Sequence, residues 1–282
     1  MPELPEVETI VRCLRGPLVG RRVVRARLRY AMLYRRRSLR VTWLTGRTIT
    51  AVERVGKNAV FRFAPSGIMT VNLGMTGRLA LAPSNAASSS RRKDCSASER
   101  ESRKHLHGRF VLHGEDELRY YDPRRFGYIY ITANDHIRDD LRIAPDPFEI
   151  SLRGNAAGGL FRGRRAPIKS LLLDQKLLSG IGNIYADETL FAAKIDPRTP
   201  GGDIAPHARR LLAAARRVLE SAIAHGGSTV RDYRRVDGTR GNYQNHHAVY
   251  GREGEPCMIC GNAIKRIVLS GRSAHFCPIC QK

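Results

Sequence analysis

The C-terminal stretch 257–280, CMICGNAIKRIVLSGRSAHFCPIC, contains four of the six cysteines of the chain. Their spacing, C-x2-C-x16-C-x2-C, is typical of a zinc ribbon. Two residues between thiolates let one turn present both sulfurs to a tetrahedral ion, and two such turns complete the site. A pair of disulfides would need an oxidising compartment, of which the sequence gives no sign. The spacing therefore predicts one structural Zn²⁺ bound by Cys257, Cys260, Cys277 and Cys280, with no position left open for a substrate.

The charge of the whole chain indicates a polyanionic partner. Its 282 residues include 49 Lys and Arg against 26 Asp and Glu, which gives a formal net charge of +23. Nucleic acid is the favoured partner, because each Lys or Arg that neutralises a phosphate releases a condensed counterion. A membrane surface usually requires a basic amphipathic helix or a lipid anchor, and the sequence shows neither. Charge alone does not separate a DNA enzyme from a ribosomal or architectural protein.

The composition also bounds the class of protein. With 42% hydrophobic and 27% charged residues, the chain can bury a core, which excludes disorder throughout. No apolar stretch approaches the roughly 18 residues of a membrane span, and the acidic N-terminus lacks the apolar core of a signal peptide. We therefore expect a cytoplasmic protein of about two domains, with no membrane contact.

The N-terminal half shows the pattern of an antiparallel β-sandwich or barrel preceded by a helix. Residues 23–30 alternate apolar and basic side chains, which is the period of a half-buried strand. Further short strands, several of them separated by turn residues, are predicted at 39–44, 59–63, 68–73, 109–112, 118–121 and 128–131. Residues 84–104 interrupt the pattern with seven serines and six Lys or Arg, and they predict a disordered surface loop.

From Pro167 onward the apolar period becomes helical. Helices are predicted after Pro167, at about 184–193, and along an apolar stripe within 211–223 that Gly226 and Gly227 end. The chain is thus predicted as an α+β protein with a β-rich domain at 1–135, a linker at 136–165, a helical domain at 166–248 and a zinc hairpin at 249–282.

The opening residues, Met-Pro-Glu-Leu-Pro-Glu-Val-Glu-Thr, carry a possible nucleophile. The apolar spacing that follows predicts a helix from about Pro5, and acids at a helix start are routine capping. Removal of Met1, however, would turn Pro2 into a terminal secondary amine. An α-amine has a pKa of about 7.7–8.0, and the positive end of a nearby helix would lower it, so neutral nucleophile would be abundant at neutral pH. Glu3 could supply or take the proton.

Four motifs together resemble the bacterial formamidopyrimidine-DNA glycosylases, repair enzymes that remove oxidised purines. The nine opening residues are the first motif. The others are the hairpin sequence DPRRFG at 122–127, the turn GNIYA at 182–186 and the four-cysteine end from 254 to 282. The resemblance implies an N-terminal β-sandwich, a helix–two-turn–helix domain and a terminal zinc-finger hairpin. It also implies double-stranded DNA with oxidised bases or abasic sites as the partner.

The resemblance implies catalytic roles for five residues. Pro2 would attack C1′ of the damaged nucleotide and form a Schiff base, with Glu3 as the acid of ring opening and Glu6 as a supporting carboxylate. Lys57 would contact phosphate and serve the β-elimination, and Arg272 would grip phosphates beside the lesion and serve the second elimination. No redox cofactor is needed.

The same resemblance implies a set of DNA-binding side chains. Met75, Arg124 and Phe126 would fill the space left by a flipped base, whose loss of stacking costs a few kcal/mol. Phosphate or backbone contacts are implied for His105, Arg164, Lys169 and Asn183, the last at a helix start, where amides and the dipole favour an anion. The loop 237–245 would close over the damaged base.

Two alternatives stay open at this point. An endonuclease-VIII-like relative would use the same chemistry on oxidised pyrimidines, although Leu4 stands where that branch typically carries Gly. A non-catalytic, zinc-stapled DNA-binding protein would explain the charge and the cysteines, but not Pro2, Glu3, Lys57 and Arg272 together. We expect a monomer.

Overall fold

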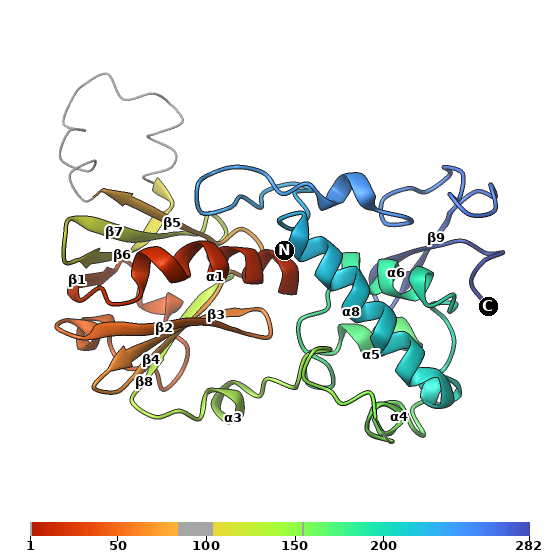
Figure 1. Ribbon diagram of the computed structural model, residues 1–282, viewed down its shortest axis with the longest axis horizontal. Helices are drawn as coiled ribbons and strands as arrows, with labels where there is room; N and C mark the ends of the chain where they lie inside the picture. Colours follow the sequence, from red (N-terminus) through yellow and green to blue (C-terminus); the bar gives the residue numbers. More distant parts are fainter. Residues whose placement is uncertain (1, 84–103, 154) are drawn as a thin grey trace. The chain divides into compact units, whose positions relative to one another are not determined.

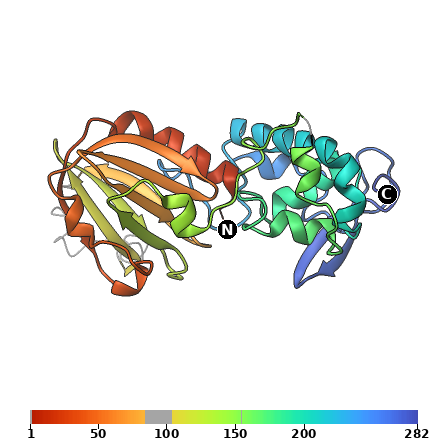
Figure 2. The ribbon, with the colours of Figure 1, turned by 90° about the horizontal axis from the view of Figure 1, so that it is seen from below.

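The computed structural model describes residues 2–83, 104–153 and 155–282 (Figures 1 and 2). Within them the chain divides into two compact units. The first unit holds residue 2 and residues 6–141 and 228–241, and the second holds residues 3–5, 142–227 and 242–282. The predicted loop at 84–104 lies, apart from Lys104, outside the described residues.

The first unit contains two four-stranded antiparallel sheets. One sheet has the order β1-β6-β7-β5, with bounds Val23–Leu28, Leu106–Leu112, Asp116–Tyr121 and Arg78–Pro83. The other has the order β2-β3-β4-β8, with bounds Thr48–Val55, Asn58–Ala64, Ile68–Asn72 and Tyr128–Thr132. The short helix α3 (Ile137–Leu141) ends the unit's main segment. The predicted antiparallel sandwich is confirmed.

The helix α1 (Leu4–Leu18) shares the core of the sandwich. Its apolar side chains recur every three or four residues, so Val7, Val11 and Leu14 lie on one face, and each is fully buried. They join a cluster that draws on both sheets, including Phe61 and Phe110. In the view of Figure 1, α1 runs along the sandwich with β6 and β7 on one side and β2 and β3 on the other.

One predicted strand is absent from the structure, and two observed strands were not predicted. The strand predicted at 39–44 is wrong: Val41–Leu44 forms a 3-10 helix, and the Val41 N–H donates to the Tyr34 hydroxyl at 2.8 Å. The strands β2 and β5 were not predicted. A bulge near Ile49 breaks the alternation in β2. Of its described side chains, the strand β5 contributes only Leu79 and Leu81 to the core cluster, and the polar sequence 84–104 follows it directly.

The second unit is a helical core with a β-hairpin. Its helices are α4 (Ala156–Gly159), α5 (Ile168–Leu173), α6 (Asn183–Ala192), α7 (Gly201–Ile204) and α8 (Ala208–Ala224). The predicted stripe is confirmed in α8, where Leu211, Leu212, Ala215 and Leu219 are fully buried. The strands β9 (Lys265–Leu269) and β10 (Arg272–Phe276) form the hairpin, drawn in dark blue in Figure 2. In the described parts of the chain, no helix has the length and apolarity to cross a membrane.

The segment 136–165, predicted as a linker, is divided between the two units. Residues from Arg142 onward belong to the second unit, where Ile150 and Phe161 are buried in the helical core. The Arg216 guanidinium of α8 also donates to the Pro147 carbonyl at 2.7 Å. Its apolar side chains are spread among arginines, aspartates, glycines and prolines without a helix or strand period, so the sequence gives no sign that they anchor it in a core.

Candidate functional site

The Glu3 carboxylate is fixed at the start of helix α6 in the second unit. It accepts the backbone N–H of Gly182 at 2.6 Å, of Ile184 at 3.1 Å and of Tyr185 at 3.4 Å. These are donors of a helix N-terminus that the helix itself cannot satisfy, and the dipole there favours a negative group. Only 3% of Glu3 is exposed. The chain directly after Pro2 is therefore held in one place.

Two glycines make room for this contact. A Cβ on Gly182 would lie 2.3 Å from Cδ of Glu3, and a Cβ on Gly180 would lie 2.6 Å from a methyl carbon of Leu4. Gly180 also has a φ of +93°, and its carbonyl accepts the Leu4 N–H at 3.0 Å. The turn 180–182 thus fits residues 3 and 4 only because it lacks side chains.

Pro2 and Glu6 belong to the first unit, and both are buried. The Glu6 carboxylate accepts the Ser228 N–H at 2.7 Å, and the Tyr233 hydroxyl donates to the Glu6 carbonyl at 3.4 Å. Burial, together with the charge of Glu6, raises the pKa of Tyr233, so this phenol stays a donor. The segment 228–241 therefore anchors the first turn of α1.

Lys57 lies in a two-residue turn between β2 and β3, since Val55 pairs with Asn58. Gly56 has a φ of +59°, which suits the first position of such a turn. The Asn58 side chain donates to the Val55 carbonyl at 3.1 Å and accepts from Tyr128 at 3.1 Å. The turn that carries Lys57 is thus braced from the sheet.

Met75 and Phe126 are apolar yet exposed, by 38% and 58%. The Arg124 guanidinium stacks over the Phe126 ring, with 4.7 Å from Cζ to the centroid. The two loops touch closely, because a Cβ on Gly74 would lie 2.5 Å from the Phe126 backbone. The structure therefore brings these three predicted wedge residues onto one pair of loops.

Asp122, a residue without a predicted role, holds those loops together. It is fully buried, and its carboxylate accepts from the Thr76 hydroxyl at 2.7 Å, the Gly127 N–H at 2.8 Å and the Tyr120 hydroxyl at 3.1 Å. Burial, reinforced by the Asp122 charge, raises the pKa of Tyr120. Asp122 is the first residue of the DPRRFG motif, and its place there was the one sign in the sequence that it has a role.

The remaining DNA-binding candidates lie in different settings. His105 is half-buried beside the undescribed residues, and Arg164 is exposed. Arg272 is exposed at the start of β10. Asn183 begins α6, and its amide Nδ2 donates to the Ser273 hydroxyl at 3.2 Å.

Lys169 departs from the expected phosphate contact. Its side chain is fully buried, and Nζ donates to Oδ1 of Asp187 at 2.6 Å. Burial lowers the pKa of Lys169, although the Asp187 charge opposes this. A wholly enclosed ammonium cannot reach an external phosphate in this arrangement, so the expectation of direct contact is corrected to an internal ion pair.

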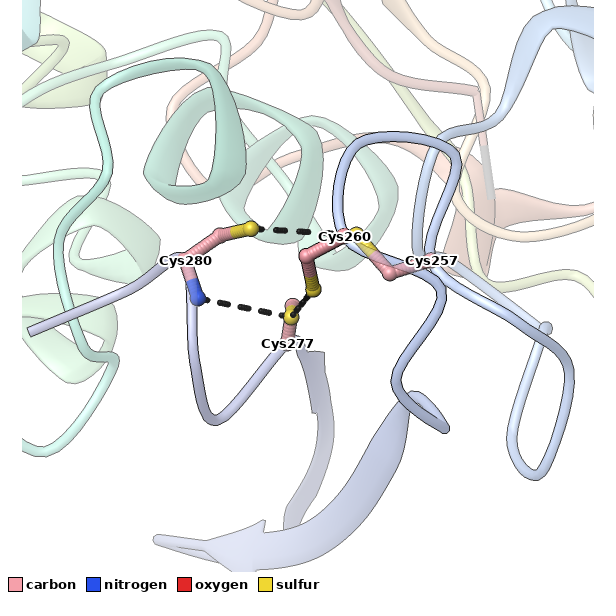
Figure 3. A group of neighbouring side chains, drawn as sticks. All are labelled: Cys257, Cys260, Cys277 and Cys280. Atoms are coloured by element: carbon pink, nitrogen blue, oxygen red, sulfur yellow. Dashed lines mark hydrogen bonds between the residues drawn. The ribbon is translucent and has the colours of Figure 1, made fainter.

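The four predicted zinc cysteines converge at the end of the second unit (Figure 3). Their sulfur atoms all lie within 4.8 Å of one another, with 3.4 Å between Cys260 and Cys277 and 3.9 Å between Cys257 and Cys280. A disulfide requires about 2.05 Å, whereas four sulfurs about 2.3 Å from one tetrahedral ion stand about 3.8 Å apart. Backbone N–H groups of Ile259 and Cys280 also point at ligand sulfurs. The residues fit Zn²⁺.

Comparisons with known proteins agree with this geometry. Three family models match: the formamidopyrimidine-DNA glycosylase N-terminal domain over residues 1–129, the formamidopyrimidine-DNA glycosylase H2TH domain over 143–234, and a zinc finger found in FPG and IleRS over 254–282. The last match and the cysteine geometry together confirm the predicted zinc site.

Relatives cover the whole chain. A formamidopyrimidine-DNA glycosylase of Thermus thermophilus is 40% identical over 100% of this chain and 98% of its own, and that of Rhizorhabdus wittichii is 41% identical over 100% of both. The crystal structure of the Thermus thermophilus MutM (Fpg) protein matches with a TM-score of 0.81, at 40% identity over 99% of this chain and 98% of that one. A Lactococcus lactis Fpg complex with Fapy-dG-containing DNA matches with a TM-score of 0.82, at 31% identity over 99% and 100%. This chain therefore belongs to the formamidopyrimidine-DNA glycosylase family.

Proposed function

We propose that this protein is a bifunctional DNA glycosylase and abasic-site lyase that removes oxidised purines from duplex DNA. The observation that carries the proposal is the threefold amide contact of Glu3, which fixes the chain directly after Pro2. Solved relatives support the substrate class, since they are described in complex with Fapy-dG, carbocyclic 8-oxo-G and abasic-site DNA. The net charge of +23 supports a polyanionic partner.

The first steps of the reaction use the N-terminal nitrogen. After removal of Met1, which lies outside the described residues, the lone pair of Pro2 attacks C1′ and the base leaves with the electron pair of the glycosidic bond. The Glu3 carboxylate takes the proton that the Pro2 nitrogen loses on attack and delivers it to O4′ as the sugar ring opens, and an iminium forms between Pro2 and C1′. Glu6 supports the same turn of helix through its bond to Ser228.

The later steps cut the backbone on both sides of the opened sugar. Loss of a C2′ proton from the iminium expels the 3′ phosphate, and loss of a C4′ proton then expels the 5′ phosphate. Lys57, in its braced turn, serves the β-elimination beside a phosphate. The exposed guanidinium of Arg272 grips phosphates and serves the second elimination, because its planar donors match phosphate oxygens.

The wedge loops serve base flipping. Met75 and Phe126 are apolar side chains that are exposed to solvent, and Arg124 lies over the Phe126 ring. An aromatic ring, a thioether and a guanidinium can replace part of the stacking that a flipped base loses. This use accounts for their exposure.

The test compares duplexes that carry one lesion each. We expect excision of 8-oxoguanine and formamidopyrimidine, followed by strand products of β- and δ-elimination. Preferential excision of thymine glycol would favour the endonuclease-VIII-like alternative instead. Binding without any base release would favour a non-catalytic DNA-binding protein. The monomeric state and the cytoplasmic location stay predictions.

A further inference from the structure

A buried ion pair in the second unit contacts the strand that carries Arg272. Lys169 of α5 and Asp187 of α6 pair at 2.6 Å with both side chains fully buried. A pair of this kind seldom adds stability beyond what apolar residues of equal volume would give, because both ions lose their hydration. A gain in folding stability therefore does not explain why the chain buries this ion pair. The other hydrogen bonds of Lys169 and Asp187 indicate its role.

Both members of the pair bond to β10. Nζ of Lys169 donates to the Ser273 carbonyl, and Oδ2 of Asp187 accepts the His275 N–H at 3.0 Å and pairs with Nδ1 of His275 at 2.9 Å. Residues 273 and 275 are two apart, so their backbone groups face the same edge of the strand. A two-stranded hairpin leaves one such edge of β10 without a partner strand, and the ion pair satisfies it.

Two further hydrogen bonds tie the same hairpin to α5 and α6. The Asn183 amide donates to the Ser273 hydroxyl at 3.2 Å, and the hydroxyls of Ser170 and Ser270 lie 2.9 Å apart. These contacts flank Arg272 on both sides in the chain. The backbone that presents Arg272 is thus fixed from the helices rather than by the hairpin alone.

We propose that Asp187 and Lys169 are positioning residues that hold Arg272 in register for a backbone phosphate without touching the DNA themselves. The inference rests on the proposed function of Arg272. Each of the two charges binds one backbone group of β10, so removal of the pair frees the strand edge. Arg272 then loses the fixed geometry on which a bidentate phosphate contact depends.

A double-mutant cycle on DNA binding tests the coupling. The variant K169M/D187N removes both charges together, which avoids leaving one buried ion unpaired. We expect this variant and Arg272→Ala each to weaken duplex binding about tenfold, the size of one charge-assisted contact. Each should also reduce the steepness of the plot of log binding constant against log salt concentration by about 0.9, the value for one phosphate. The combined variant should bind no more weakly than Arg272→Ala alone.

Independent effects would overturn the proposal. If the combined variant binds about a hundredfold more weakly than wild type, as two separate contacts would give, or if K169M/D187N keeps the wild-type salt slope, the pair does not act through Arg272. Glu117→Gln is the matched control, because Glu117 is a fully buried carboxylate paired with Arg109 and Arg119 in the first unit. It should change the unfolding midpoint and leave the salt slope unchanged.

Two safeguards keep the result interpretable. Zinc content and thermal midpoint are measured for each variant, and K169M/D187L, which also removes both charges together, replaces K169M/D187N if the latter fails to fold. The cycle is run on undamaged duplex as well as on lesion DNA. A wild-type protein that cleaves no oxidised-purine DNA would refute the proposed function, yet the coupling to Arg272 could still be measured.

Discussion

The Glu3 carboxylate accepts the Gly182 N–H at 2.6 Å, and the space that a Cβ would need on Gly182 is filled by Glu3 itself. Glu3 thus supplies the negative charge, and Gly182 supplies the N–H donor and, because it lacks a side chain, the space for the carboxylate. Gly182 has φ −124° and ψ −158°, an extended conformation open to any residue. Its lack of a side chain therefore serves the contact with Glu3 and not the backbone.

Gly182→Ala should consequently disable catalysis more than folding. The new Cβ would lie 2.3 Å from Cδ of Glu3 and displace the carboxylate. We expect a loss of about 1–3 kcal/mol in unfolding free energy, and a fall of about 100-fold in single-turnover excision, since small misplacements of catalytic groups are costly. Gly16→Ala is the control, because its Cβ would meet nothing within 4 Å. Equal activity of both variants would contradict the role of this contact.

Phe126→Ala should weaken binding to lesion DNA and leave stability nearly unchanged. The ring is 58% exposed, so little packing is lost, whereas stacking on a base is worth about 1–3 kcal/mol. We expect about tenfold weaker binding in a fluorescence titration. Val24→Ala removes another exposed apolar side chain of the same unit, 51% exposed, and should bind as wild type does. Similar losses in both variants would count against a wedge.

Loss of zinc should release the hairpin and abolish tight DNA binding. Atomic absorption should find one Zn²⁺ per chain, and Cys277→Ser should lose it, because zinc binding at such sites is worth about 10 kcal/mol or more. Cys13→Ser serves as the control, since Cys13 lies on α1 and outside the four-cysteine cluster. Retention of full DNA affinity by the zinc-free Cys277→Ser protein would contradict a structural role of the metal.

His247 should make stability depend on pH in a known direction. Burial lowers the pKa of His247 from 6.5 to about 4, and the nearby His246 acts in the same direction. The unfolded chain then binds the proton more tightly, so unfolding free energy should rise with pH from about 4 to 6.5, by up to about 3 kcal/mol. Urea titrations across this range measure the rise. His247→Phe keeps the ring packing against Tyr243 and Tyr250 and should remove most of the rise in unfolding free energy with pH. The same rise in this variant would show that His247 is not its cause.

The motifs that predict the candidate site are local in the sequence. Cysteine spacing predicted the zinc site, and the opening residues pointed to Pro2 and Glu3 before any contact was known. The hydrogen bonds that organise the second unit join residues that are far apart in the sequence. Glu3 bonds to Gly182, and Asp187 bonds to His275. No local pattern encodes such pairings, and Lys169 is an example: the resemblance implies a DNA contact for it, whereas the fold buries it against Asp187.

The fold was predicted where periodicity was clean and missed where a single residue disrupted it. The stripe of α8 repeats without interruption and was located correctly. In β2 the bulge between Ile49 and Ala51 shifts the alternation by one residue, so the pattern of inward side chains is broken. Residues 39–44 carry enough apolar side chains for a strand, yet tertiary contacts such as that of Val41 with Tyr34 select a 3-10 helix.

The most direct measurement is peptide mapping of the adduct that sodium borohydride traps between this protein and 8-oxoguanine DNA. Reduction converts an iminium into a stable amine, so mass spectrometry can locate the bond. We expect a peptide that begins at Pro2, lacks Met1 and carries the sugar remnant on its terminal nitrogen. An adduct on a lysine such as Lys57, or a retained Met1 with no adduct at all, would contradict the account.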